Sequence, residues 1–177
     1  MRVLSFLIIL SIFGCSGIKI SGVDAAEGFT ISKYKTYNFF EIGASGDAIG
    51  PNYRKNVELL KTAITKQIQA KGLTIDRAEP DLLINIGIAV TEEVQTRETN
   101  FANPADRQYM GTRNYSWESK EVPVNRYRQG SITIDLVDRV ANAMVWQGTA
   151  ESVIPSKEKN VPALIESSME KLFEEIK

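Results

Sequence analysis

Aromatic and arginine side chains that could form a binding surface are concentrated between residues 97 and 128. Tyrosine, tryptophan and arginine are enriched at the energetic centres of protein interfaces, and their amphipathic side chains also suit glycans and lipid head groups. We therefore predict that this segment binds a partner. The alternative is a long hairpin whose aromatic side chains pack against their own domain. The candidate binding residues are Arg97, Phe101, Arg107, Tyr109, Arg113, Tyr115, Trp117, Arg126, Tyr127 and Arg128.

The amino-acid composition of the chain excludes most known catalytic mechanisms. The 177 residues include no histidine, which excludes Ser-His and Cys-His nucleophiles and histidine metal sites. Cys15 is the only cysteine, so the chain forms neither an internal disulfide nor a cysteine-cluster metal site. Because 21 basic residues nearly balance 22 acidic ones, the charge does not favour nucleic acid as a partner. We expect a protein that is not an enzyme and uses neither a cofactor nor a metal.

Two further patterns have simpler structural explanations. Asp135 and Asp138 could bind a hard cation, but they supply only two ligands, and aspartate is common in turns. Ser168 and Lys171 match the S-x-x-K pattern of certain hydrolases, but the companion motifs of those enzymes are absent. A hydrolase is therefore only a distant third hypothesis.

Polar side chains that alternate along the predicted strands could line a surface for a small molecule or a glycan. An antiparallel sheet with one face in water explains the same alternation without any ligand. The residues of this polar sheet face are Asn85, Thr91, Thr133, Asp135, Gln147 and Thr149.

The first fifteen residues resemble a bacterial lipoprotein signal. Arg2 supplies a positive charge, residues 3–13 form an apolar run of eleven residues, and Gly14 precedes Cys15. A membrane-spanning helix needs about 17–25 residues, whereas this run has the length of a signal-peptide core. The alternatives are an ordinary signal peptide with an incidental cysteine, or a buried N-terminal helix.

This resemblance implies that residues 1–14 are removed and that Cys15 becomes the acylated N-terminus, as in palmitate-bearing lipoproteins. Two or more acyl chains anchor a protein stably in a bilayer. Ser16 follows the cysteine where an aspartate would resemble an inner-membrane retention signal, and no acidic run follows that would indicate export to the cell surface. We therefore expect a protein of the cell envelope that is anchored in the outer membrane and faces the periplasm.

The rest of the chain predicts one domain over residues 28–177, after a short tether over residues 15–27. Apolar residues at helical spacing predict helices, and alternating apolar or aromatic residues predict strands. Residues 97–119 match no regular element, and glycines over residues 43–51 predict a loop. The predicted strands cover residues 30–41, 82–91, 122–136 and 144–150, and the predicted helices cover residues 52–71 and 160–176.

These elements predict an α+β fold. Each helix has one apolar stripe, and the strands together offer one strongly apolar face. The simplest arrangement is a two-layer α/β sandwich, in which a mostly antiparallel sheet carries two amphipathic helices on one face.

Five short motifs occur in a characteristic order along the chain. They are Phe29 with Tyr34-Lys35-Thr36-Tyr37, then Lys71-Gly72-Leu73, Pro80-Asp81-Leu82-Leu83, residues 130–138 and residues 145–150. In this order and spacing they resemble the DUF4136 family of bacterial lipoproteins over nearly all of residues 18–176. The family usually has an aromatic residue such as tryptophan where Phe39 stands, and it often has more glycines in the stretch that corresponds to residues 97–119. Since the family has no settled activity, the resemblance implies a fold and a location but no catalytic residue.

We therefore predict a membrane-anchored periplasmic lipoprotein with a non-catalytic binding role in the bacterial cell envelope. Its expected partners are the lipid bilayer, through acylated Cys15, and an envelope protein or glycan, with no nucleic acid. The anchor would raise the effective concentration of the domain toward a nearby partner. The alternative is a lipoprotein that binds a small molecule or glycan on the polar sheet face.

Overall fold

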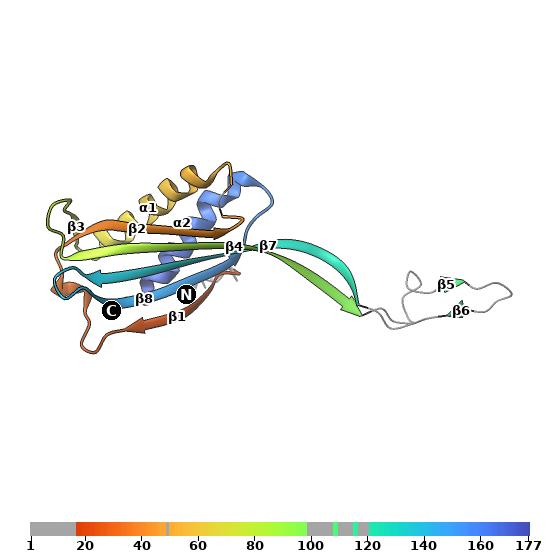
Figure 1. Cartoon of the computed structure of the whole chain (residues 1–177), viewed down its shortest axis with the longest axis horizontal. Helices are drawn as coiled ribbons and strands as arrows, with labels where there is room; N and C mark the ends of the chain where they lie inside the picture. The colour runs from red at the N-terminus through yellow and green to blue at the C-terminus, as the bar shows by residue number, and fades with distance from the viewer. Residues whose placement is uncertain (1–16, 49, 99–107, 110–114, 117–120) are drawn as a thin grey trace, which may run out of the picture.

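The computed structural model describes residues 17–48, 50–98, 108–109, 115–116 and 121–177 (Figure 1). The predicted signal peptide and Cys15 lie outside the described residues. The strands are β1 (Lys19–Ala25), β2 (Thr36–Gly46), β3 (Thr74–Ile75), β4 (Leu82–Glu98), β5 (Gln108–Tyr109), β6 (Tyr115–Ser116), β7 (Glu121–Asp138) and β8 (Ala143–Val153). The helices are α1 (Tyr53–Ala70) and α2 (Val161–Glu174), with short 3-10 turns η1 (Ile31–Lys33) and η3 (Glu158–Asn160).

Six strands form one mixed sheet in the order β1-β8-β7-β4-β2-β3, and β5 and β6 form a separate pair. Antiparallel pairing joins β1, β8, β7 and β4. By contrast, β2 is parallel to both β4 and β3, so the sheet is mixed and not simply antiparallel. The reason is the helix α1, which returns the chain to the end of the sheet where β2 began, as a crossover between parallel strands requires.

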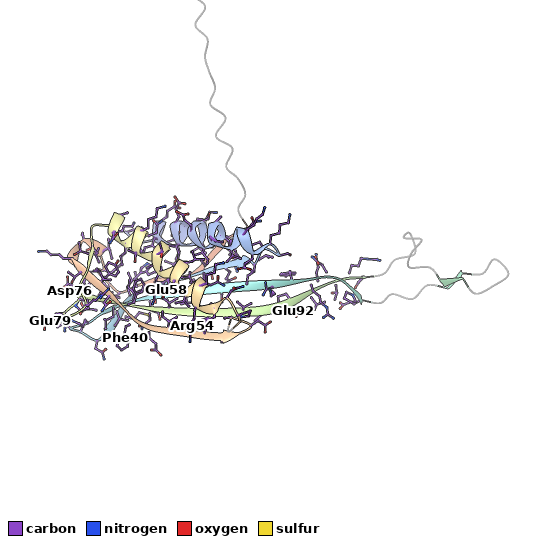
Figure 2. All side chains as sticks on the ribbon, turned by 90° about the horizontal axis from the view of Figure 1, so that it is seen from above. Phe40, Arg54, Glu58, Asp76, Glu79 and Glu92 are labelled. Atoms are coloured by element: carbon purple, nitrogen blue, oxygen red, sulfur yellow. The ribbon has the colours of Figure 1, made fainter. Side chains whose placement is uncertain are left out.

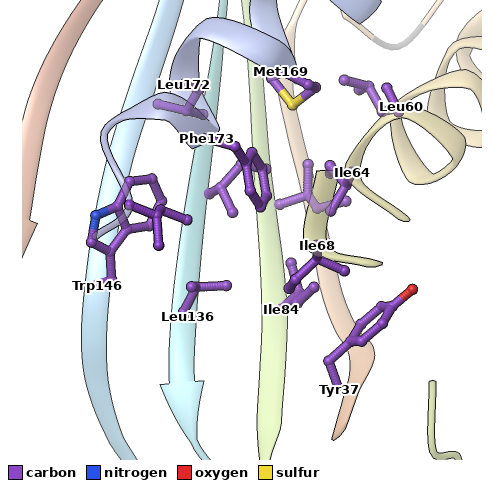
Figure 3. Close-up of a cluster of buried hydrophobic side chains, with 14 of the residues drawn as sticks. Tyr37, Leu60, Ile64, Ile68, Ile84, Leu136, Trp146, Met169, Leu172 and Phe173 are labelled. Carbon is purple, nitrogen blue, oxygen red and sulfur yellow. The ribbon is translucent and has the colours of Figure 1, made fainter. Parts of the chain in front are cut away.

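Both helices pack against the same face of the sheet, where the hydrophobic core lies (Figure 3). Ile84 on β4 and Leu136 on β7 are fully buried there, and they meet the apolar stripes of the helices. Trp146 on β8 and Phe173 on α2 lie with their ring centroids 6.3 Å apart. The predicted α+β class with an apolar sheet face is therefore confirmed.

The structure explains why the motif at residues 145–150 has a glycine at position 148. A Cβ atom at this position would lie 2.7 Å from the Trp146 ring and 2.9 Å from a methyl group of Leu172. Real Cβ contacts are essentially never this close, so glycine is what lets α2 approach β8 over the tryptophan.

The predicted elements differ from the structure mainly in length. The predicted helices agree with α1 and α2 to within a few residues. The predicted first strand was wrong at both ends, because η1 occupies its start and β2 continues to Gly46 through residues predicted to form a loop. Strand β4 also continues to Glu98, well beyond its apolar part. None of the helices in the described ranges is long and apolar enough to cross a membrane.

Candidate functional site

Strands β4 and β7 extend beyond the other four strands of the sheet (Figure 1). The pairing of β2 with β4 ends at Gly46 opposite Val90, and the pairing of β8 with β7 ends at Val153 opposite Gln129. Beyond these positions residues 91–98 and 121–128 belong to one antiparallel ladder with a register shift between Gln95 and Thr96, and in the described chain β4 and β7 have no other strand partner there. We call this two-stranded ribbon the arm. Eight residues at about 3.4 Å each give it a length of about 27 Å.

The sequence of the arm explains why it is a ribbon and not part of the core. The helix-facing side of β4 changes from Leu82, Ile84 and Ile86, which are buried, to Glu92 and Val94, which are exposed. Arg126 lies diagonally opposite Glu92, and their charged groups are 3.5 Å apart. Figure 2 shows Glu92 on the ribbon, well away from Glu58 on α1. The arm therefore presents two solvent-exposed faces and two strand edges without a neighbouring strand.

The arm contains part of the predicted binding surface. Arg97, Arg126, Tyr127 and Arg128 all lie on it, and Arg97 and Tyr127 are half-buried. Tyr109 and Tyr115 face each other as a register pair of β5 and β6. The structure thus brings these six residues onto two antiparallel strand pairs. The remaining four predicted residues lie outside the described ranges, and they are Phe101, Arg107, Arg113 and Trp117.

The predicted polar sheet face lies on the side away from the helices. One row across the sheet runs from Asn85 through Asp135 to Gln147, and the next contains Thr133 and Thr149. The two threonine hydroxyls are 2.9 Å apart and hydrogen bond to each other. One side-chain oxygen each of Asn85 and Asp135 is buried without a hydrogen-bond partner. The side chains of this face therefore supply hydrogen-bond partners for only some of its polar atoms.

The family motifs of residues 34–37, 80–83 and 130–138 meet at the end of the sheet opposite to the arm. One carboxylate oxygen of Asp81 accepts hydrogen bonds from the backbone N–H groups of Lys35 (2.8 Å) and Thr36 (3.0 Å). The backbone N–H of Asp81 donates in return to the Thr36 hydroxyl at 2.9 Å. Asp81 thereby fixes the start of β2 beside the start of β4.

Asp138 closes the turn between β7 and β8 at the same end. It accepts hydrogen bonds from the backbone N–H groups of Val140 (2.9 Å) and Ala141 (2.8 Å) and from the Tyr34 hydroxyl (3.2 Å). The bond from Ala141 is the main cause that holds the pKa of Asp138 below its usual range, and the bond from Lys35 has the same effect on the pKa of Asp81. Both carboxylates are thus held ionised by structural hydrogen bonds.

The residues of the two weaker catalytic patterns lie in β7 and in α2. Asp135 lies in the row with Asn85, whereas Asp138 belongs to the turn. Within the described residues no group of three or more potential metal ligands is found. Ser168 is buried in α2 at 2% exposure, three residues before the half-buried Lys171.

A cavity of about 370 Å³ lies at the base of the arm. It is bounded by the sheet, by the first turns of α1 and α2, and by the chain that follows β8. Its walls are largely apolar, with Leu60, Ile88, Ile132 and Ile165 among the lining residues. Its volume lies within the range of about 300–1,000 Å³ that is typical of ligand pockets.

A few polar groups also line this cavity. They include Arg128 from the arm, Asp47 and Ser168. Glu158 is bound to Lys55 at 2.9 Å, so its charge is already paired. The cavity was not predicted from the sequence, because its walls come from four stretches that are far apart in the chain. They lie within residues 47–60, 88–90, 128–132 and 152–168. The one available signal was Arg128, which follows Leu136, Ile134, Ile132 and Gly130 on the helix-facing side of β7.

Solved structures with a similar fold share little sequence with this chain. A PelC dodecamer from Paraburkholderia phytofirmans matches with a TM-score of 0.50 and 10% identity, over 90% of this chain and 96% of that chain. A PDZ domain protein from Parabacteroides distasonis matches with a TM-score of 0.49 and 16% identity over 88% of this chain. The match spans 37% of the length of that PDZ domain protein. At these identities the likeness concerns the fold alone.

No curated protein matches the sequence. The model of the DUF4136 family, described as a domain of unknown function, matches residues 22–176. This range includes both helices, the arm and the six-stranded sheet except for the first residues of β1, together with all the motifs noted above. The chain therefore belongs to the DUF4136 family.

Proposed function

We propose that this protein is a lipid-anchored protein of the bacterial cell envelope that acts by binding and not by catalysis, and that the arm contacts its partner. The observation that carries the proposal is the extension of β4 and β7 as a ribbon with exposed faces and open edges. A two-stranded ribbon by itself is only marginally stable in water. Open strand edges invite another strand, and natural proteins use such edges to bind extended peptides.

Site-specific photo-crosslinking in living cells tests the arm. A crosslinking amino acid replaces Glu93 or Val94, whose side chains point to opposite faces of the ribbon, and replaces Glu58 on α1 as the exposed control. We expect one crosslinked product of defined mass from an arm position and none from Glu58. Equal products from all three positions, or no product from the arm, would contradict the proposal.

The anchor is a separate part of the proposal and has its own test. Its support is the signal-like residues 1–14 followed directly by the only cysteine of the chain. Cys15→Ser should move the protein from the membrane fraction to the soluble fraction, because the acyl chains are then lost. If the variant stays with the membranes, Cys15 is not the anchor.

A second candidate function is binding of a small molecule or glycan on the polar sheet face. The buried, unpartnered oxygens of Asn85 and Asp135 favour it, because buried polar atoms in native proteins normally have a partner. A ligand with hydroxyl groups would raise the melting temperature of the protein, and Asp135→Ala would abolish this rise. The absence of any shift across a panel of envelope sugars would count against this candidate.

A further inference from the structure

The cavity at the base of the arm supports an inference that does not depend on the partner of the arm. We propose that it binds a single-chain amphiphile, with the apolar chain between the helices and the sheet and an anionic head group at Arg128. The claim concerns a site apart from the polar sheet face, since the cavity lies on the helix side.

The size and the walls of the cavity fit one short apolar chain. Water-sized groups occupy about 30 Å³ each, so about a dozen heavy atoms fill a volume of 370 Å³. Ile88 and Ile132 form the floor on neighbouring strands, and Leu164 and Ile165 of α2 lie above them. Apolar walls on both sides favour transfer of an alkyl chain from water into the cavity.

The charges around the cavity favour a negative head group. In the described structure the Arg128 guanidinium has no ion-pair partner, because Glu92, its neighbour across the strands, pairs with Arg126. The cavity is also lined by Asn52 and Val161 at the N-terminal ends of the two helices, where the helix dipole is positive. Neither helix has a side-chain N-cap hydrogen bond. Asp47 and Glu158 are the acidic lining residues, and Glu158 is paired with Lys55. The two helix ends together with Arg128 outweigh the remaining charge of Asp47.

Ser168 adds a polar group to the largely apolar lining. Only 2% of this residue is exposed, and it lines the cavity. Its hydroxyl can donate a hydrogen bond to an oxygen atom of a bound molecule.

Decanoate is a suitable probe, because it has twelve heavy atoms, one straight chain and a carboxylate. The full chain, produced with Cys15→Ser so that no lipid is attached, is titrated below the micelle concentration while the isoleucine methyl signals are followed by NMR. We expect saturable shifts of Ile132 and Ile165, which line the cavity. Ile84 is buried in the same core but does not line the cavity, so its signal should stay unchanged.

Matched variants and probes test the charge. Arg128→Gln should weaken decanoate binding about tenfold, because it removes a charge-assisted hydrogen bond. Arg54→Gln is the control, and it should leave binding unchanged because Arg54 is exposed and does not line the cavity. Decyltrimethylammonium and decanol, which lack the negative charge, should bind at least tenfold more weakly than decanoate.

A cavity-filling variant tests the location. Ser168→Leu places an apolar side chain where the chain of the ligand would lie, so binding should be lost while the melting temperature is kept. The proposal is overturned if Ile132 and Ile165 do not respond, if Ile84 shifts as much as they do, or if Ser168→Leu folds and still binds. Equal binding of decanoate and decyltrimethylammonium would overturn the anionic head group.

Discussion

The polar side chains at the two ends of the six-stranded sheet differ in their interactions with the rest of the chain. At the end formed by the starts of β2 and β4, Asp81 and Asp138 each accept several hydrogen bonds from the backbone. At the arm end, the Arg128 side chain is exposed and makes no ion pair within the described residues, and the described strands of the arm have no neighbouring strand beyond Val90 and Gln129. Satisfied polar groups hold a fold in one conformation, whereas unsatisfied ones are available to other molecules. The first end is therefore structural, and the arm end is where we propose that other molecules bind.

The largest difference in stability is expected between Ile86→Ala in the body of the sheet and Val94→Ala in the arm. Both residues lie on the helix-facing side of β4, but Ile86 is 1% exposed and Val94 is 46% exposed. Ile86→Ala should lower the free energy of unfolding by about 3 kcal/mol, because it leaves a cavity in the core. Val94→Ala should change it by less than about 0.5 kcal/mol. Urea unfolding measures both values, and similar losses would show that the arm is packed like the body.

Asp81→Ala and Asp47→Ala compare a carboxylate at each end. Asp81→Ala should cost about 2 kcal/mol, because the backbone N–H groups of Lys35 and Thr36 lose a charged acceptor. Asp47 is exposed to solvent, so Asp47→Ala should leave stability nearly unchanged. Both are measured by thermal and urea unfolding. A larger loss for Asp47→Ala would reverse the assignment of the two ends.

Low pH should destabilise the protein through Asp81 and Asp138. The pKa values of Asp81 and Asp138 are lowered in the folded chain by their backbone hydrogen bonds. A lowered pKa contributes stability above the unfolded-state value of about 3.9, and this contribution is lost as the pH falls through the folded-state pKa. The free energy of unfolding should therefore decrease as the pH falls below about 4. Asp81→Asn should make this decrease shallower, and an unchanged slope would contradict the role of Asp81.

The smallest effect is expected for the ion pair between Lys66 on α1 and Glu166 on α2. The hydrogen bond that Lys66 donates to Glu166 is the main cause that raises the pKa of Lys66, but both side chains are exposed to solvent. Exposed pairs of this kind are screened by water and salt. Glu166→Gln should leave the unfolding midpoint in urea unchanged within error. A clear decrease would mean that contacts between the helices contribute more than their exposure suggests.

The sequence allowed much of the fold to be predicted, because hydrophobic spacing is local. The stripe of Val57, Leu60, Ile64 and Ile68 identified α1, and the alternation that begins at Leu82 identified β4. The parallel pairing of β2 was missed, because strand direction depends on where the chain returns after α1. The extension of β4 to Glu98 was also missed, because polar residues in a ribbon lack the alternation of a half-buried strand.

The candidate sites show the same division. Arg126, Tyr127 and Arg128 were predicted to bind a partner because of their residue types, and the structure places them on the arm. The cavity could not be predicted, because Arg128, Ser168 and Asn52 come together only when β7, α2 and α1 are packed. Likewise, the pairing of Asp81 with residues 35 and 36 spans more than forty residues of chain.

By itself the sequence determined the family, the α+β class, the two helices and the absence of histidine chemistry, because each of these depends on residue identity or short-range spacing. It also contains the signal-like segment before Cys15 that supports the proposed anchor. Only the tertiary structure decided that β2 pairs in parallel, that β4 and β7 leave the sheet as an arm, and that a cavity lies where this arm begins. These features depend on contacts between residues far apart in the chain, and hydrophobic spacing carries no information about such contacts.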